Sequence, residues 1–447
     1  MAPWRSLGGS MVWPITAQRD AREALSIGGV SVAELASRYG TPLYIYDEAT
    51  IRSQCRLYTQ SLTQAHPRPR VVYAGKAWLS LALLKIIADE GLSLDVVSAG
   101  ELYVALEAGF PAERISFHGN NKAPDELKMA LDSNIGQIVV DNFYEIDCLE
   151  ELTANRTEPF PVLLRLNPGI DVHTHDYRKT GIVDSKFGLG IQTGDAACAV
   201  ERLVNAPGLV LRGYHAHVGS QIFEVEPFVD TVNAIFDFAG EMKERHGVIP
   251  DEMSPGGGFG IQYEESDPAA PVEEYIQAIG AAAQMAARRI GIPDPEFTIE
   301  PGRSIVGTAG IAVYTVGATK VIPGVRTYVS VDGGMADNIR PALYGAVYSA
   351  ELVTGRKDEP VELVTIAGKF CESGDVLIDK TTLPQLTAGD LVTVPVAGAY
   401  SLAMASNYNM ALRPAVVFVS EGETRLVQRR ETFQDLVQRD VAQTTGG

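Results

Sequence analysis

Several features are scarce in this 447-residue sequence. Its four cysteines (Cys55, Cys148, Cys198 and Cys371) are widely scattered and form neither a CxxC pair nor a zinc-ligand spacing. That usage favours a reducing compartment such as the cytoplasm over a disulfide-bonded exterior. No apolar run reaches the ~18 residues of a membrane span. Residues 1–14 have one arginine and no continuous apolar core, so we expect no signal peptide.

Positive charge is also in the minority. The chain has 37 lysines and arginines against 56 acidic residues, which gives a formal net charge of −19. Such a field argues against nucleic acid or an anionic membrane as a partner. Local arginines can still bind a small anion. With 46% hydrophobic residues, the chain can form the sizeable core of a globular protein.

Apolar runs and helical patterns alternate between residues 71 and 300. This alternation predicts parallel strands joined by helices, and eight such units fit a closed (β/α)8 TIM-like barrel better than an open sheet. The predicted strands are Val71–Ala74, Leu94–Ser98, Ile115–His118, Gln137–Asp141, Pro161–Asn167, Leu211–His217, Glu252–Pro255 and Phe297–Glu300.

After Arg303 the rhythm changes to short β-rich runs that glycine and proline separate, with few helices between them. We expect a second, mostly antiparallel β domain. The predicted division is an N-terminal segment at 1–45 that packs on the β domain, a barrel at 46–306 and the C-terminal β domain at 307–447.

Lys76 follows the first predicted barrel strand, in the run Val71 to Trp78. If the strand is buried, its end partly shelters the amine, which would favour the neutral, nucleophilic form. A lysine of that kind can bond a carbonyl group or pyridoxal phosphate. The alternative is an ordinary lysine that points into solvent. The pattern gives no role for the neighbouring Trp78.

Barrel enzymes carry their functional residues just past the carboxyl ends of the strands. Lys76 lies at such a place, and so do the other polar and glycine motifs of the predicted barrel. Phosphate sites in barrels commonly use the loops after the last two strands, and three glycines there would let the backbone approach a phosphate. A tight loop without a ligand is the alternative for the glycines. The motifs are SAGE (98–101), HGNNK (118–122), HAHVGSQ (215–221), GGGFG (256–260) and EPGR (300–303).

Two of these motifs contain side chains that suit a pyridoxal ring. Glu300 could hold the pyridine nitrogen protonated, although an ion pair with Arg303 would also explain it. His217 could stack on the ring, or it could be a core histidine. His173 and His175 are too weak a pair to predict a metal site, and we predict none.

Nine motifs in a fixed order resemble one family, the diaminopimelate decarboxylases of the alanine-racemase-like, fold-type III group of pyridoxal-phosphate enzymes. They extend over nearly the whole chain. The motifs are YAGKA, DVVSAGEL, FHGNNK, SKFG, HAHVGSQI, GGGFG, EPGR, CESGD (371–375) and SNYN (406–409).

The resemblance implies a barrel with a C-terminal β domain, a homodimer with shared active sites and pyridoxal phosphate as cofactor. The implied reaction is decarboxylation of meso-diaminopimelate to L-lysine, the last step of lysine biosynthesis. Its implied catalytic residues are Lys76, which bonds the cofactor, and Cys371 of the partner subunit, which donates a proton. The implied cofactor contacts are Lys76, His217, Ser220, Gly258, Glu300, Arg303 and Tyr400, and the implied substrate contacts are Arg303, Arg340, Tyr344, Glu372 and Tyr400.

The residues support this substrate independently. The far end of meso-diaminopimelate carries a carboxylate and an ammonium, so its site needs a cation and an anion together. Arg340 can grip the carboxylate and Glu372 the ammonium. Lysine or ornithine would leave the arginine unpaired.

Three other interpretations remain at this stage. The chain departs from the group's pattern at Lys76-Ala77-Trp78, where asparagine is common, and after Tyr400, which bears on substrate details. A different basic-amino-acid decarboxylase or a carboxynorspermidine decarboxylase of the same fold is the nearest alternative. A racemase is disfavoured, because that subgroup typically has an arginine where Glu300 stands. A non-catalytic regulatory relative is disfavoured because Lys76 and Cys371 are both present.

Overall fold

The computed structural model of the protein describes residues 5–170, 185–268, 271–356 and 359–441. The chain divides into two compact units. One, which we call the barrel unit, comprises Arg52–Ile261 and Pro268–Ile305. The other, which we call the β unit, comprises Met1–Ile51, Gln262–Asp267 and Val306–Gly447.

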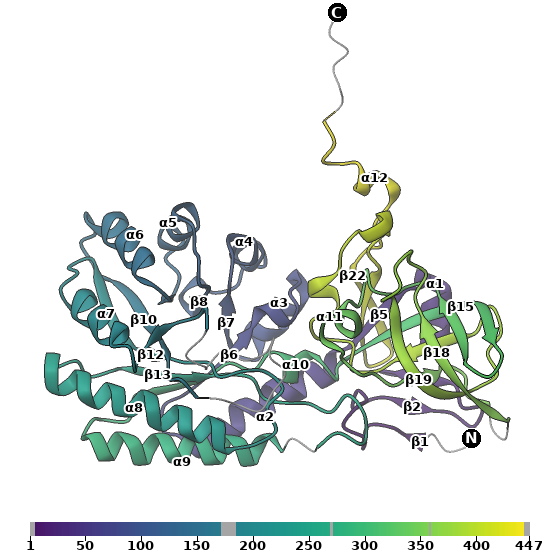
Figure 1. The fold of residues 1–447 in the computed structure, drawn as a ribbon, viewed down its shortest axis with the longest axis horizontal. Helices are drawn as coiled ribbons and strands as arrows, with labels where there is room; N and C mark the ends of the chain where they lie inside the picture. Colours follow the sequence, from purple (N-terminus) through teal and green to yellow (C-terminus); the bar gives the residue numbers. More distant parts are fainter. Residues whose placement is uncertain (1–4, 171–184, 269–270, 357–358, 442–447) are drawn as a thin grey trace, which may run out of the picture. The chain divides into compact units, whose positions relative to one another are not determined.

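The barrel unit contains a closed ring of eight parallel strands, several of which are labelled in Figure 1. Each strand pairs with the next, and the pairings of β9 with β10 and of β14 with β6 complete the ring. A two-residue strand, β11 (Leu189–Gly190), adds to β10. The predicted barrel is confirmed, with its eight strands at β6 (Pro69–Ala74), β7 (Ser93–Val96), β8 (Ile115–Phe117), β9 (Gln137–Val140), β10 (Phe160–Asn167), β12 (Leu209–His215), β13 (Glu252–Gly256) and β14 (Glu296–Ile299).

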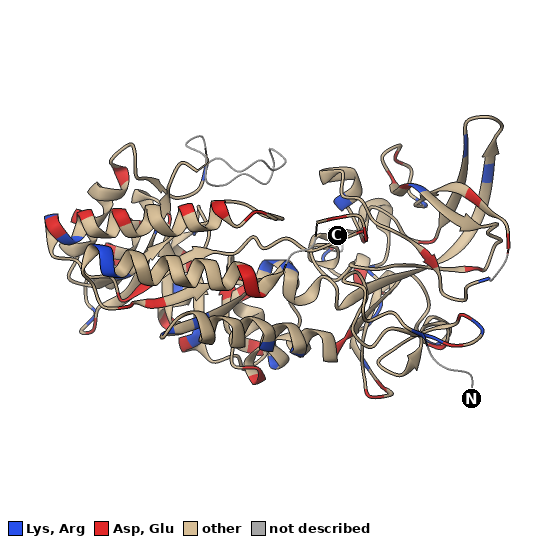
Figure 2. Ribbon diagram, turned by 90° about the horizontal axis from the view of Figure 1, so that it is seen from below, with Lys and Arg blue, Asp and Glu red and all other residues tan. Residues whose placement is uncertain are grey.

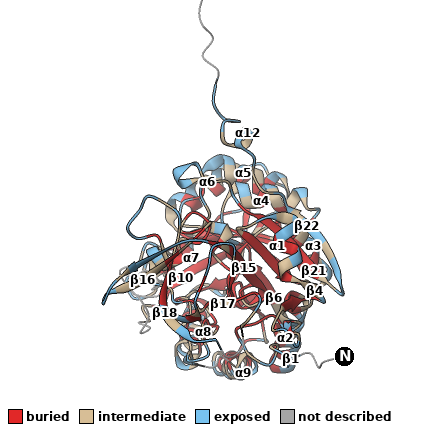
Figure 3. Cartoon of the chain, turned by 90° about the vertical axis from the view of Figure 1, so that its right-hand side faces the viewer, coloured by how far each residue is buried: buried red, intermediate tan, exposed pale blue. Residues whose placement is uncertain are grey.

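The strands are largely buried, as the red segments in Figure 3 show. Their continuous apolar runs follow from this, because a barrel strand is covered on both faces. Helices lie outside the ring, and acidic and basic residues are interspersed along them (Figure 2). These helices are α2 (Glu48–Ala65), α3 (Leu81–Asp89), α4 (Ala99–Glu107), α5 (Pro124–Asp132), α6 (Phe143–Thr153), α7 (Asp195–Val204), α8 (Glu226–His246), α9 (Val272–Ile290) and α10 (Arg303–Val306).

Side-chain caps begin several helices within a few residues of a strand end. Ser80 accepts a hydrogen bond from the Leu83 amide at the start of α3, and Ser98 accepts one from the Glu101 amide at the start of α4. Such a cap satisfies one of the unpaired amides of a first helical turn. Because the caps fix where each helix starts, they also fix the short loops of the functional rim.

The β unit is mostly antiparallel, as predicted, and contains two sheets. The larger sheet takes β5 from the N-terminal segment, where it pairs antiparallel with β15 and parallel with β21. Its strands are β5 (Leu43–Asp47), β15 (Gly310–Ile322), β16 (Arg326–Val331), β17 (Glu351–Leu352), β18 (Val361–Ala367), β19 (Val376–Pro384), β20 (Leu391–Val394), β21 (Ala415–Ser420) and β22 (Glu423–Gln428).

The smaller sheet of the β unit is built by the N-terminal residues alone. Its four strands are β1 (Arg5–Ser6), β2 (Gln18–Arg19), β3 (Leu25–Ile27) and β4 (Val30–Ser31). Short helices complete the unit at α1 (Val32–Tyr39), α11 (Arg340–Tyr344) and α12 (Phe433–Leu436). No helix among the described residues combines the length and apolar character of a membrane span.

Candidate active site

The lysine loop leaves β6 as a single 3-10 turn, Gly75–Ala77. Gly75 and Ala77 are buried, whereas Lys76 between them is exposed. The expectation of a partly sheltered amine is therefore wrong for the single chain. The backbone of the turn is anchored to β7, because the Gly75 amide donates to Asp95 Oδ1 at 3.2 Å. The turn thus holds the Lys76 backbone in place while its side chain is exposed.

Trp78 has a structural role beside this lysine. Its side chain is buried, and its carbonyl oxygen accepts a hydrogen bond from the Tyr73 hydroxyl at 2.7 Å. Tyr73 lies in β6 and is itself buried. The two aromatic residues therefore tie both ends of the lysine turn to the core, which answers the question that the sequence left open.

Two carboxyl groups lie within electrostatic range of Lys76. Burial raises the pKa of Asp95 to about 8, although the charge of Lys76 acts in the opposite direction. Burial also raises the pKa of Glu101, again against Lys76. Both residues belong to the DVVSAGEL motif, but the sequence assigned neither of them a role. An acidic residue inside an otherwise apolar strand was the available signal for Asp95.

The glycine run after β13 is packed too tightly for side chains. A Cβ on Gly257 would lie 2.0 Å from the Glu300 carbonyl oxygen, and one on Gly258 would lie 2.3 Å from that of Gly219. Gly258 also has a φ of +110°, which L-residues rarely adopt. The loops after β12, β13 and β14 therefore meet here, backbone against backbone. A loop without side chains can bring its main-chain N–H groups close to a phosphate.

Ser220 and Arg303 come together at the same rim. The Arg303 Nη2 atom donates to Ser220 Oγ at 3.0 Å. Arg303 is buried at the start of α10, and Ser220 follows β12. A buried arginine beside a hydroxyl and a glycine loop is a donor set that suits a phosphate group.

Glu300 is a buried carboxylate directly after β14. Its oxygens face His215 Nε2 at 3.1 Å and Ser254 Oγ at 3.3 Å. Burial raises the pKa of Glu300, but His215 and His118 lower it more, so the net pKa lies below the ordinary value. The group is therefore an anion, as a partner of a protonated pyridine nitrogen must be.

His217 is held by the glycine loop. Its Nδ1 atom accepts a hydrogen bond from the Gly257 amide at 3.3 Å. Burial, followed by the positive charge of Lys76, lowers the pKa of His217 well below its ordinary value. The ring is thus neutral near pH 7 and can pack flat against another ring without losing a charge's solvation.

The remaining predicted residues belong to the β unit. Arg340 is buried, and its Nη1 atom donates to the hydroxyls of Tyr263, at 2.7 Å, and Tyr348. Tyr344 lies at the end of α11. Tyr400 has a φ of 60°, an uncommon conformation for a residue other than glycine. The structure therefore gathers the predicted cofactor residues, Tyr400 excepted, in the barrel unit, and the predicted substrate residues, Arg303 excepted, in the β unit.

Cys371 and Glu372 are exposed on the loop that precedes β19. The Cys371 amide donates to Asn409 Oδ1 at 3.0 Å, and the Phe370 amide donates to Asp375 Oδ2 at 2.8 Å. The loop is thus shaped by main-chain bonds to the SNYN and CESGD motifs. The Cys371 thiol takes no part in these bonds.

Two groups of residues bear on metal binding. His173 and His175, the pair that the sequence offered, lie outside the described residues. His118, His215 and Glu300 are buried and have ligand atoms within 4.8 Å of one another, an arrangement that could hold a metal ion. The absence of a metal site stays a prediction.

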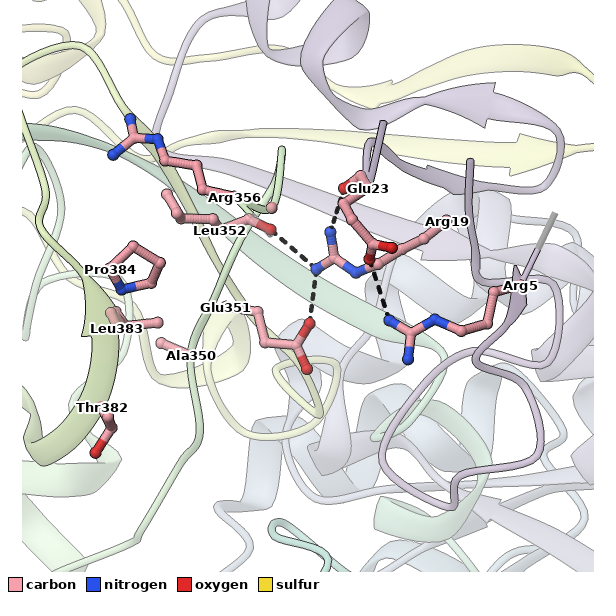
Figure 4. Close-up of a pocket in the computed structure, with 11 residues that line it drawn as sticks. Arg5, Arg19, Glu23, Ala350, Glu351, Leu352, Arg356, Thr382, Leu383 and Pro384 are labelled. Atoms are coloured by element: carbon pink, nitrogen blue, oxygen red, sulfur yellow. Dashed lines mark hydrogen bonds and ion pairs between the residues drawn. The ribbon is translucent and has the colours of Figure 1, made fainter. Parts of the chain in front are cut away.

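A separate cavity of about 510 Å³ lies in the β unit, lined by Arg5, Arg19 and Arg356 among others (Figure 4). Arg19 donates to Glu351 Oε2 at 2.6 Å, and Arg5 contacts Glu23 at 3.2 Å. Arg356 is paired with Asp390 at 2.5 Å. Each arginine therefore already has a carboxylate partner, and the cavity has no surplus of charge to define a ligand.

Comparison with known proteins identifies the family. Residues 48–307 match the family model described as "Pyridoxal-dependent decarboxylase, pyridoxal binding domain". The diaminopimelate decarboxylase of Bacillus subtilis (strain 168) is 49% identical over 431 residues, which cover 96% of this chain and 98% of that protein. This chain belongs to the diaminopimelate decarboxylase family. Accordingly it is a pyridoxal-phosphate enzyme.

Solved structures of the family agree with the fold. The diaminopimelate decarboxylase of M. jannaschii superposes with a TM-score of 0.89 at 33% identity, over 96% of this chain and 98% of that one. The same protein in complex with L-lysine gives a TM-score of 0.88 over the same shares of both chains. The predicted fold-type III architecture is therefore confirmed.

The residues of the barrel unit fit the family's cofactor. The packed glycine loop, with Arg303 and Ser220 beside it, suits the phosphate, and the buried Glu300 anion suits a protonated ring nitrogen. The neutral His217 ring suits packing against the cofactor ring, and the exposed Lys76 amine suits the cofactor aldehyde. This chemistry makes each of these residues a testable contact.

Gly257→Ala is expected to weaken pyridoxal-phosphate binding by at least about tenfold, because a Cβ at 2.0 Å from the Glu300 carbonyl must push the two loops apart. Gly100→Ala is the matched control, since its Cβ would meet only Ser98 Oγ at 3.7 Å. Titration of the cofactor-free proteins by fluorescence measures both. Equal affinities for the two variants would contradict a phosphate role for the loop.

Proposed function

We propose that this protein decarboxylates meso-diaminopimelate to L-lysine and carbon dioxide, the last step of lysine biosynthesis. The observation that carries the proposal is the nearly full-length similarity to diaminopimelate decarboxylases, one of which was crystallised with L-lysine. The retained lysine, acid and cysteine of the active-site motifs support an active enzyme over a regulatory relative.

The proposed cofactor contacts follow the chemistry of each group. Lys76 bonds the cofactor aldehyde, and His217 packs against the ring. Glu300 faces the ring nitrogen. The phosphate is held by Ser220, Gly258 and Arg303, and Tyr400 is shared between cofactor and substrate. The support is the joint placement of the first six of these residues in one unit, with the contacts described above.

When bound, pyridoxal phosphate supplies the electron sink that accepts the pair left as carbon dioxide departs. Glu300 keeps a proton on the ring nitrogen, which strengthens that sink. Lys76 would hold the cofactor aldehyde through its amine when no substrate is bound. Cys371 of the partner subunit donates a proton to the α-carbon. Arg303 is placed to contact the substrate as well as the phosphate.

Arg340, Tyr344 and Glu372 are the proposed contacts of the far end of the substrate. The two tyrosine hydroxyls that accept from Arg340 fix the plane of its guanidinium. A fixed guanidinium can bind a carboxylate through two parallel hydrogen bonds. The carboxylate of Glu372 can balance the substrate ammonium.

We further propose a homodimer in which each active site takes Cys371 and Glu372 from the other subunit. Both side chains are exposed in the single chain, as residues that reach into a partner must be. The proposed functional domains are the N-terminal segment at 1–45, the pyridoxal-phosphate-binding barrel at 46–306 and the C-terminal β domain at 307–447. All four cysteines are free thiols, which suits the reducing cytoplasm.

The decisive experiment is a substrate panel. Purified protein with pyridoxal phosphate should release carbon dioxide and lysine from meso-diaminopimelate, and little carbon dioxide from ornithine, arginine or lysine. Preferential carbon dioxide release from one of those three amino acids, or from carboxynorspermidine, would change the proposed substrate but not the proposed reaction type. If none of these compounds released carbon dioxide, the proposed decarboxylase activity would be wrong.

Arg340→Lys is expected to lower kcat/KM for meso-diaminopimelate by about tenfold or more, mainly through KM. A lysine keeps the charge but loses the planar pair of donors that matches a carboxylate. Steady-state kinetics measure the effect, and unchanged cofactor affinity shows that the site is intact. A variant with native kinetics would remove Arg340 from substrate recognition.

A further inference from the structure

We propose that His215, supported by His118, is a positioning residue that holds the Glu300 carboxylate in place for the ring nitrogen of the cofactor. The inference deepens the proposed function and rests on its assignment of Glu300. Both histidines occur in motifs, FHGNNK and HAHVGSQI, that pointed to the family, but neither has a role in the cofactor or substrate sets above.

The barrel brings these residues together by register. His215 is the last residue of β12 and is paired with Arg165 of β10 on one side and Ser254 of β13 on the other. Residues in register on adjacent strands point to the same side of the sheet. His118 directly follows β8, as Glu300 follows β14. The strands β8, β12, β13 and β14 thus bring His118, His215, Ser254 and Glu300 into one buried cluster.

The hydrogen bonds fix the proton positions in this cluster. An ionised carboxylate only accepts, so the 3.1 Å contact between His215 Nε2 and Glu300 Oε2 requires the proton on Nε2. His215 Nδ1 is buried and has no hydrogen-bond partner among the described residues. Ser254 Oγ accepts from the Gly256 amide at 3.1 Å, which leaves its proton for Glu300 Oε1 at 3.3 Å. Glu300 therefore receives one donor on each oxygen.

His118 completes the cluster as a second ring. Its Nε2 atom lies 3.7 Å from Glu300 Oε1, and its ring meets that of His215 edge-on, with centroids 4.9 Å apart. Edge-on contact of this kind fixes the orientation of both rings. Burial, with His215, Arg165 and Lys76 acting in the same direction and Glu300 opposing, lowers the pKa of His118 well below its ordinary value. A neutral His118 leaves Glu300 its negative charge for the cofactor.

The same three residues could hold a metal ion, but the charges around them favour the hydrogen-bonded cluster. The buried guanidinium of Arg165 acts electrostatically on both Glu300 and His118. A divalent cation would add positive charge to this enclosed site and would take the carboxylate from the ring nitrogen.

Two substitutions of His215 by amide side chains of different length test the proposal. His215→Gln can place an amide N–H near the position of Nε2, whereas His215→Asn is too short to reach Glu300. The probes are deoxypyridoxine phosphate, which cannot bond Lys76, and its deaza counterpart, which lacks the ring nitrogen. Binding is measured by calorimetry on the cofactor-free full-length chain. His215→Asn should weaken the binding of deoxypyridoxine phosphate, the nitrogen probe, about tenfold, and His215→Gln should weaken it less. Neither variant should alter binding of the deaza probe.

A double-variant cycle separates positioning from general damage. His215→Asn added to Glu300→Gln should cost the nitrogen probe no further affinity, because the carboxylate is already gone. His66→Asn is the control for the loss of a buried histidine, since the His66 ring packs at a tilt against Phe297, near the start of β14, whereas Glu300 follows its end. If His215→Asn does not fold, as judged by thermal melting, His118→Gln is compared with Glu300→Gln in the same way.

Several outcomes would overturn the proposal: equal weakening of both probes, an additive double variant, or metal in the native protein that His215→Asn loses. A Glu300→Gln variant that binds both probes as the native chain does would overturn the role of Glu300 as well. Failure of the native enzyme on meso-diaminopimelate is a different result, because the probes do not report on substrate.

Discussion

Replacing Lys76 with alanine is expected to abolish the visible absorbance of the lysine-bound cofactor and to reduce decarboxylation by at least roughly 10³-fold. No other side chain in the proposed cofactor set offers an amine to the aldehyde. Absorbance spectra of the variant with added pyridoxal phosphate, together with carbon dioxide release from meso-diaminopimelate, measure the two effects.

The exposure of Lys76 makes this experiment clean. Because the side chain points away from the core while Gly75 and Ala77 are buried, its removal should leave the melting temperature nearly unchanged. Lys85→Ala is the control, since Lys85 is an exposed lysine on the neighbouring helix α3. A Lys76→Ala protein that keeps the native spectrum would remove Lys76 from its role.

The barrel could be predicted because its physical signal is strong. Most strand residues are buried, so the strands read as largely apolar runs, and several helices begin at a serine or asparagine cap. The functional rim followed, since parallel strands bring all their carboxyl ends to one edge. Lys76, His217, Glu300 and Arg303 could be placed there from spacing alone.

The β unit was less predictable, because its strands are short or half exposed. β19 mixes buried and exposed residues without regular alternation, β22 has no buried residue, and three of the four N-terminal strands have only two residues. Neither pattern separates a strand from a loop. Pairing partners far along the chain, such as β5 with β21, make these segments strands.

The site details that were missed all depend on register. Asp95, His118 and His215 were visible as residues, but only strand pairing shows that they lie around Lys76 and Glu300. The exposure of Lys76 was also mispredicted, because a buried strand does not determine which way the next turn points. The sequence alone could not supply these relations.

Replacing Cys371 with alanine is expected to slow turnover of meso-diaminopimelate by about 10²-fold or more, which is the usual effect of removing a positioned proton donor. Cofactor affinity and spectrum should not change. The loop should keep its shape, because Asn409 accepts from the Cys371 main chain and Asp375 accepts from the Phe370 main chain. Cys198→Ala controls for loss of an exposed thiol, since Cys198 lies on α7 in the barrel unit.

Mixing the two inactive proteins tests whether the thiol belongs to the other subunit. In a dimer of Lys76→Ala with Cys371→Ala, one site would combine an intact lysine from one chain with an intact cysteine from the other. Random exchange puts half of the subunits into such dimers, so about one quarter of the native turnover should return. No recovery after verified subunit exchange would show that lysine and cysteine act within one chain, and native turnover by Cys371→Ala alone would remove the thiol from the reaction.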